Sequence, residues 1–243
     1  MIPLVWACPE NSVNTIEKLL EKNFDGDYVV LPVIRTQRLE LKNEIIVEIK
    51  RKISKTTALL ITSKVTANII EENERLSFLK NLKCYCVGEV SYNLCLKYGF
   101  NTLPDLIFTS AKEACKAMFQ DNYVDNYILP GAKKRAENYN EIFSSAGLKN
   151  SYQELDLYNT LHLSKDEIPN KLIQKLMNFE ASKFISLFSS PSCAFAYQSL
   201  GFSFGEKQIA IGKTTSNALE SLGYTSVYPG EPSYASMLNQ LEN

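Results

Sequence analysis

Short apolar runs alternate along the chain with segments in which apolar residues recur at helical spacing. The runs lie at the start of 126–147 and at 4–7, 29–34, 58–62, 84–87, 105–108, 155–163, 185–188 and 209–211. Several runs are followed by Ser, Thr or Gly, which are residues that start helices. Strands that alternate with helices in this way predict an α/β fold built on parallel sheets flanked by helices.

Two parts of the chain repeat one strand–turn–helix pattern. Residues 58–70 read ALLITSKVTANII and match FISLFSSPSCAFA at 184–196. Residues 84–99 read CYCVGEVSYNLCLKYG and match QIAIGKTTSNALESLG at 208–223. In both copies of the second segment, the Gly that ends the helix lies 11 positions after the Gly that follows the strand. This shared register predicts two similar α/β lobes.

The lobes are expected to be discontinuous in sequence. The second repeat lacks a first strand–helix unit, whereas the amino terminus has such a unit without a lobe of its own. We therefore predict one lobe from residues 1–33 and 162–243, and an inserted lobe from 38–154. Residues 31–37 and 155–161 would be the linker strands. Because ligands of parallel sheets bind beyond the carboxyl ends of the strands, we expect a cleft between the lobes.

Composition excludes several classes of function. The net charge is −1, so the chain has no electrostatic footprint for nucleic acid or a membrane surface. No run approaches the roughly 18 apolar residues of a membrane span. The start, MIPLVWAC, resembles a lipoprotein cleavage site only at its small residue before Cys8, and we interpret it as a first strand. We expect a cytoplasmic protein that does not bind nucleic acid or membranes.

Six cysteines occur without paired metal-ligand spacing. Cys84 and Cys86 share a face of a predicted strand, but nothing nearby in the sequence completes a ligand set. His162 is the only histidine, and it is expected to be structural. Zinc sites and Ser-His-acid triads are therefore disfavoured. We expect buried reduced thiols and no zinc site.

Polar residues at the helix starts are the candidate ligand-binding groups. Each start offers unsatisfied N–H groups and a partial positive charge, so several starts around one cleft suit a ligand with many carboxylates or phosphates. Helix capping is the alternative role of any single hydroxyl. The candidates are Thr62, Ser63, Ser91, Ser110, Ser190, Ser192, Gly212, Lys213, Thr214 and Thr215.

A basic cluster strengthens the prediction of an anionic ligand. Lys133, Lys134 and Arg135 precede a predicted helix within 126–147, where cations are unfavourable by about 0.3–1 kcal/mol each. An anion bound there would offset this cost. The alternative is that these side chains are solvated surface charges.

The candidate chemistry is sparse. GKTT at 212–215 is not a P-loop, because the Gly required five residues earlier is Lys207. With histidine disfavoured, a proton donor would be Tyr, Lys or an acid. Tyr158 lies on a predicted linker strand beside the expected cleft, although packing is the default role of a tyrosine.

The sequence resembles the uroporphyrinogen-III synthase family over nearly its whole length, and six segments show the likeness. They are ITS at 61–63, VGEVS at 87–91, LPGAKKRAE at 129–137, LDLYNTLH at 155–162, FSSPS at 188–192 and AIGKTTSNALESLG at 210–223. Their order and spacing carry the resemblance, since no single segment is decisive.

The resemblance implies a two-lobed enzyme that acts on hydroxymethylbilane, a linear tetrapyrrole. Such enzymes eliminate water from its hydroxymethyl group, invert the last pyrrole ring through a spiro intermediate and close the macrocycle, without a metal or organic cofactor. The family's tyrosine falls on Tyr158, which would be the general acid. The family's cleft hydroxyls fall on Ser63, Ser91, Ser190 and Thr215, beside the backbone N–H groups of Lys213 and Thr214.

Two departures and two alternatives accompany this resemblance. The first strand ends in Ala-Cys8-Pro, where the family commonly has Thr-Arg-Pro, and Ser91 replaces a common Thr. The alternatives are a non-catalytic binder or sensor of an anionic tetrapyrrole and, less well supported, a nucleotide-binding protein. For the enzyme we expect a monomer that receives its substrate from the preceding pathway enzyme.

Overall fold

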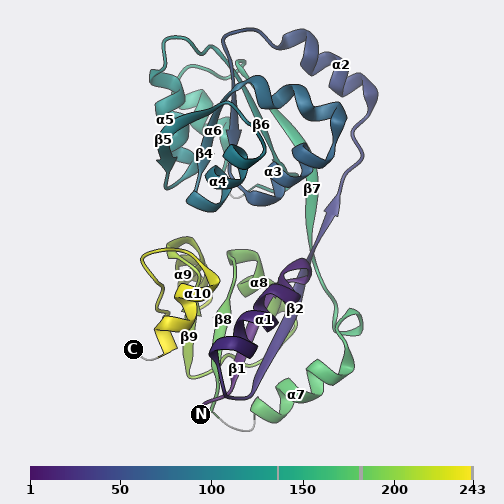
Figure 1. Cartoon of the computed structure of the whole chain (residues 1–243), viewed down its shortest axis with the longest axis vertical. Coiled ribbons are helices and arrows are strands. Elements are labelled where there is room, and N and C mark those ends of the chain that lie inside the picture. The colour runs from purple at the N-terminus through teal and green to yellow at the C-terminus, as the bar shows by residue number, and fades with distance from the viewer. Residues whose placement is uncertain (136, 181–182, 242–243) are drawn as a thin grey trace. The chain divides into compact units, whose positions relative to one another are not determined.

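The computed structural model describes residues 1–135, 137–180 and 183–241 (Figure 1). It divides into two compact units. Unit 1 consists of Met1–Gln37 and Thr160–Asn243, and unit 2 consists of Arg38–Asn159. Both divisions of the chain fall inside long strands, β2 (Tyr28–Arg38) and β7 (Tyr152–His162).

Unit 2 is built on a parallel sheet with the strand order β5-β4-β3-β6-β7. Apart from β7, its strands are β3 (Thr57–Ile61), β4 (Lys83–Val87), β5 (Thr102–Phe108) and β6 (Asn126–Ala132). Its helices are α2 (Asn43–Lys52), α3 (Lys64–Glu72), α4 (Glu89–Lys97), α5 (Ala111–Gln120) and α6 (Tyr139–Ser145).

Alternate residues of the central strand β3 enter two different cores. Leu59 and Ile61 pack in a cluster with residues of α2, α3 and α4, whereas Ala58 and Leu60 pack with residues of α5 and α6. Successive side chains of a strand point to opposite faces, so β3 is covered on both sides. This explains why its sequence is continuously apolar rather than alternating.

Unit 1 has the strand order β9-β8-β1-β2, also parallel. The remaining strands are β1 (Leu4–Pro9), β8 (Ile185–Phe188) and β9 (Lys207–Ala210). The helices are α1 (Val13–Asn23), α7 (Asn170–Glu180), α8 (Pro191–Ser199), α9 (Lys213–Ser221) and α10 (Tyr234–Leu238). Across both units, 3₁₀ turns occupy Glu10–Ser12, Glu74–Asn81, Lys165–Glu167 and Asn239–Leu241.

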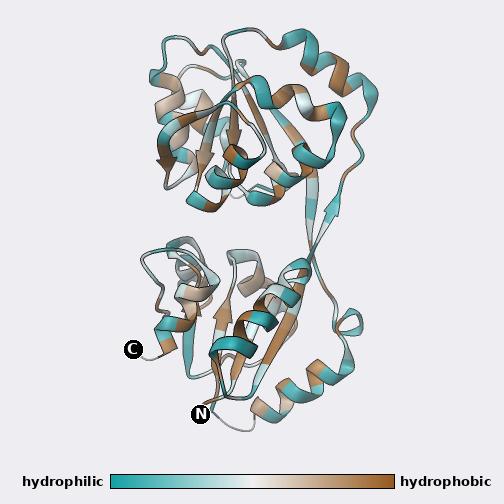
Figure 2. Cartoon of the chain, in the orientation of Figure 1, coloured by the Kyte–Doolittle hydropathy of each residue, from teal (hydrophilic) through white to brown (hydrophobic). Residues whose placement is uncertain are grey.

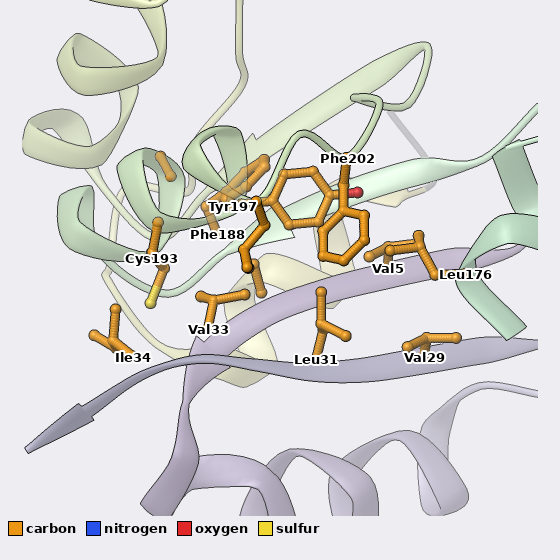
Figure 3. Close-up of a cluster of buried hydrophobic side chains, with 14 of the residues drawn as sticks. Val5, Val29, Leu31, Val33, Ile34, Leu176, Phe188, Cys193, Tyr197 and Phe202 are labelled. Carbon is orange, nitrogen blue, oxygen red and sulfur yellow. The ribbon is translucent and has the colours of Figure 1, made fainter. Parts of the chain in front are cut away.

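Two cores also enclose the sheet of unit 1. Figure 3 shows one of them, in which the rings of Phe188, Tyr197 and Phe202 pack over aliphatic residues of β1 and β2. The opposite core joins Leu4 and Trp6 of β1 to residues of α1 and α10. In both units the hydrophobic residues concentrate in the strands, while the helices alternate hydrophobic and hydrophilic residues along their length (Figure 2).

The two sheets have equivalent strand arrangements. Strand β3 lies between β4 and β6, as β8 lies between β9 and β1. The parallel register shifts at Gly131/Ala132 in the β6–β7 pair and at Cys8/Pro9 in the β1–β2 pair. The internal repeat seen in the sequence therefore extends to strand order and to the position of an irregularity. The prediction of an α/β fold with helices flanking a parallel sheet is confirmed.

The starts of α1 and α6 are stabilised in different ways. Ser12 stands at the N-cap of α1, but its side chain makes no capping bond and instead accepts a hydrogen bond from the Tyr234 hydroxyl. Helix α6 begins only at Tyr139 and is capped by the Asn138 side chain. Ala136, within the LPGAKKRAE segment, lies outside the described residues.

None of the helices in the described part of the chain has the length and apolar character that a membrane span requires.

Candidate active site

Two serines of unit 2 cap helices directly after parallel strands. Ser63 follows β3, and its Oγ accepts a hydrogen bond from the Thr66 N–H at 3.2 Å. Ser110 follows β5, and its Oγ accepts from the Glu113 N–H at 3.2 Å. Both residues are half-buried, as is Thr62 before Ser63. Capping satisfies one orphan N–H of each helix and leaves the remaining donors of the first turn available to an anion.

The structure brings two of the predicted residues into direct contact. The Tyr158 hydroxyl lies 3.1 Å from Ser63 Oγ, which is also 3.0 Å from Thr66 Oγ1. Since the backbone N–H of Thr66 already occupies one lone pair of Ser63, the remaining capacity of Ser63 is shared between two hydroxyl groups. The three hydroxyls thus form a small proton-bearing network at the start of α3.

Backbone geometry places Tyr158 at this network. It pairs with Ala132 across the register shift between β6 and β7, and its carbonyl accepts a hydrogen bond from the Lys133 N–H at 2.8 Å. The residue is 8% exposed, and its ring packs in the apolar core formed with α3 and α4. The ring is therefore held by packing while its hydroxyl meets polar groups, which is a suitable arrangement for a proton donor.

Ser91 occupies a different environment from Ser63. Gly88 caps α4 with a φ of 78°, a left-handed conformation that favours glycine, and Ser91 lies in the first turn of that helix. Ser91 is 6% exposed, whereas Glu89 and Val90 before it are exposed. The accessible groups at this helix start are therefore those of residues 88–90.

The basic cluster is divided by the structure. Lys133 and Lys134 are exposed, but Arg135 forms ion pairs with Glu154 at 2.9 Å and Asp156 at 2.6 Å. It also donates to the Leu129 carbonyl at 3.2 Å, and its side chain is only 11% exposed. The expectation that all three cations stand at a helix start is wrong, because α6 begins four residues after Arg135.

Unit 1 repeats the serine cap. Ser190 follows β8, its Oγ accepts from the Cys193 N–H at 3.2 Å, and Pro191 occupies the first turn of α8. Burial raises the pKa of Cys193 to about 12, so this thiol stays protonated beside Ser190. Ser192 is half-buried in the same turn.

Helix α9 supplies the second group of candidates in unit 1. Gly212 is its N-cap, Lys213 and Thr214 are exposed, and Thr215 is fully buried. Among the described residues, Thr215 Oγ1 is the one buried side-chain oxygen or nitrogen without a hydrogen-bond partner. Thr66 lies at the same distance from the N-cap of α3 and is equally buried, but its hydroxyl contacts Ser63.

The phenol is not duplicated in the repeat. Ile34 of β2 pairs with Pro9 after the register shift in unit 1, at the place where Tyr158 pairs with Ala132 in unit 2. Ile34 is 6% exposed and apolar. Cys8, where relatives commonly carry Arg, is fully buried, and burial raises the pKa of its thiol. At this position of the repeat, unit 2 therefore has a phenol and unit 1 has an apolar side chain.

Sequence reasoning missed two features near the candidates. Trp6 Nε1 donates to Ser189 Oγ at 3.0 Å, which fixes the loop before Ser190, and no local pattern signals this contact between distant residues. The structure also places the Cys95 sulfur within 4.8 Å of the sulfurs of Cys84 and Cys86, a proximity that the spacing of the cysteines in the sequence does not signal. All six cysteines are free and buried, as expected.

Comparisons with known proteins agree in one family. The family profile described as uroporphyrinogen-III synthase HemD matches residues 14–239. The uroporphyrinogen-III synthetase structure from Helicobacter pylori superposes with a TM-score of 0.61 at 17% identity, covering 100% of this chain and 99% of that one. A mutant uroporphyrinogen III synthase from Thermus thermophilus gives 0.65 at 15% identity, covering 100% and 98%. These two likenesses show the fold. No curated protein sequence matches the chain significantly.

Proposed function

The chain belongs to the uroporphyrinogen-III synthase family, and we propose that Tyr158 is the proton donor of its reaction and that helix starts in each unit bind carboxylates of its substrate. The activity of this family is that of a cyclising lyase in tetrapyrrole biosynthesis. The substrate is hydroxymethylbilane, as implied by the sequence resemblance.

The reaction requires little from the protein beyond a donor and a mould. An electron-rich pyrrole expels a hydroxyl group as water once that hydroxyl is protonated, so one positioned acid is sufficient. Closure without the enzyme gives the uninverted isomer. The protein must therefore fold the chain so that the ring carbon attacks in the inverted sense, which is a matter of orientation.

The contact between Tyr158 and Ser63 carries the assignment of the donor. A phenol carries an O–H donor that can deliver a proton to a departing hydroxyl. The ring is fixed in an apolar core, and the hydroxyl lies 3.1 Å from Ser63 at the start of α3. A departing hydroxyl bound at that helix start would lie close to the donor.

Charge and hydrogen bonding support the binding of a polyanion. The first turns of α3, α4, α5, α8 and α9 contain backbone donors, and the exposed Lys133 and Lys134 add positive charge. The unpaired hydroxyl of Thr215 lies in the first turn of α9, where a carboxylate would offer it an acceptor. Arg135 is proposed to act structurally through Glu154 and Asp156.

We further propose a monomer that works in the cytoplasm. Six free, buried thiols suit a reducing compartment. Substrate that is released into solution closes to the uninverted isomer. Direct transfer from the enzyme that makes the substrate would reduce this loss.

Analysis of the product isomer tests the function. Hydroxymethylbilane incubated with the protein should yield the type III isomer in excess over the spontaneous type I isomer. Tight binding of the tetrapyrrole with only type I product would contradict catalysis and favour the binder or sensor.

A further inference from the structure

Three cysteines of unit 2 converge in one core. Cys84 and Cys86 lie two residues apart on β4, so their side chains share a face of the sheet, and Cys95 lies on α4 above that face. The sulfurs of Cys84 and Cys86 are 3.6 Å apart, and all three sulfurs lie within 4.8 Å of one another. We call Cys84, Cys86 and Cys95 the three-thiol cluster.

The cluster is shielded from solvent and consists of sulfur alone. Its three residues are at most 1% exposed and belong to the apolar core that includes Leu59 and Ala67. No His, Asp or Glu of the described chain joins the group. Apolar packing requires no convergence of sulfur atoms, and the other three cysteines, Cys8, Cys115 and Cys193, lie outside the cluster.

We propose that the three-thiol cluster binds a thiophilic divalent cation of the Zn²⁺ and Cd²⁺ type. Metal–sulfur bonds of about 2.3 Å in a trigonal arrangement place the sulfurs about 4 Å apart. The separation of 3.6 Å between the sulfurs of Cys84 and Cys86, and the upper limit of 4.8 Å for all three pairs, lie on either side of this value. Small side-chain rotations would therefore suffice to close the site around an ion.

Charge and ligand type select the class of ion. Hard cations such as Mg²⁺ and Ca²⁺ require oxygen ligands, which the cluster lacks. Binding of M²⁺ replaces the remaining thiol protons and leaves a net charge of −1 when all three sulfurs are thiolates. A monovalent ion would leave −2 in the same apolar core, which costs more because buried charge is poorly solvated.

The position of the cluster gives an occupied site a structural effect. Helix α4 is bounded by Gly88 and Gly99, both with positive φ, and it is linked to β4 by the short turn at Gly88. An ion held by Cys95 and by two residues of β4 would tie the helix to the strand at one point. Ser91 lies one helical turn before Cys95, so occupancy would also stiffen the start of α4.

Titration of the whole chain with Cd²⁺ alone tests the proposal. Protein freed of metal and kept reduced should develop a thiolate-to-metal charge-transfer band that saturates at one ion per chain, with release of protons. Mg²⁺ should produce no band and should not compete. Alkylation followed by mass spectrometry should show that Cd²⁺ protects Cys84, Cys86 and Cys95 specifically.

Matched variants locate the site. Cys95→Ala should weaken Cd²⁺ binding by at least about 100-fold, since even loss of a group that only supports a ligand costs about 10–100-fold. Cys115→Ala, an equally buried cysteine on α5, should bind as the wild type does. If Cys95→Ala fails to fold, the cysteines that Cd²⁺ protects from alkylation in the wild type identify the site. The absence of a band, or protection of other cysteines, would overturn the proposal. These readouts do not depend on enzyme activity, so failure of the proposed function leaves them valid.

Discussion

The hydroxyl of Tyr158 lies 3.1 Å from Oγ of Ser63, although the two residues are 95 positions apart in the sequence. Tyr158 lies on β7, and Ser63 caps α3 directly after β3. Strand β6 lies between β3 and β7 and pairs in parallel with both of them. The proposed proton donor and the positive end of a helix are thereby brought together within unit 2. The repeat in unit 1 has Ile34 in place of the phenol.

Tyr158→Phe should slow turnover by about 10–1000-fold, because it removes the proposed donor while keeping the ring that packs in the core. The rate of type III product formation measures this effect. Tyr92→Phe is the control, since Tyr92 is 7% exposed in the same core and its hydroxyl accepts from the Asp105 N–H. An unchanged rate in Tyr158→Phe would assign the acid role to another group.

Ser63→Ala should lower both stability and turnover. Loss of the cap costs about 0.5–2 kcal/mol of unfolding free energy, and Tyr158 also loses its hydroxyl partner. Ser233→Ala removes an equivalent cap from α10, where the Ser233 Oγ accepts from the Ser236 N–H at 3.0 Å. Denaturant unfolding curves and turnover rates of the two variants distinguish the capping role of Ser63 from its role as the partner of Tyr158. Equal turnover in both would argue that Ser63 is only a cap.

Thr215→Val should leave stability unchanged or raise it by about 1 kcal/mol, because the hydroxyl that it removes is buried without a partner. It should also raise KM if a substrate carboxylate supplies that partner. Thr66→Val is the matched control, because it removes a hydroxyl at the same helix position that does have a partner. We expect Thr66→Val to lose about 1 kcal/mol. An unaltered KM in Thr215→Val would exclude its hydroxyl from substrate binding.

Arg135→Met should destabilise the protein by about 1–3 kcal/mol, since it leaves Glu154 and Asp156 adjacent without their cation. Lys134→Gln should instead raise KM and leave the melting temperature within experimental error, because that side chain is exposed. Thermal unfolding and steady-state kinetics of both variants test whether Arg135 acts structurally and Lys134 acts in substrate binding. A melting temperature unaffected by Arg135→Met would refute the structural role.

The Asp121 carboxylate should make unit 2 sensitive to acid. Burial raises its pKa, but hydrogen bonds from Lys83 and Tyr85 outweigh burial and hold the pKa below its usual value. A lowered folded-state pKa stabilises the fold above the unfolded value of about 3.9 and loses this effect as the pH falls further. The difference in unfolding free energy between wild type and Asp121→Asn should therefore shrink below about pH 4. A difference independent of pH would contradict this account.

Local sequence patterns determined the elements and many of their boundaries. Apolar runs predicted the strands because central parallel strands are buried on both faces, as β3 is. Serine caps predicted the starts of α3, α5 and α8, because a cap is a contact between neighbours in sequence. The start of α6 was misplaced, because basic residues before a helix carry no boundary signal comparable to a cap.

Contacts between residues distant in sequence were decided only by the tertiary structure. Arg135 forms ion pairs with two carboxylates of β7. Cys95 of α4 lies beside Cys84 and Cys86 of β4 in the three-thiol cluster. Sequence periodicity states which face a residue occupies, but not which residue of another element meets it there. That choice depends on strand order and register, which arise from the packing of the whole sheet.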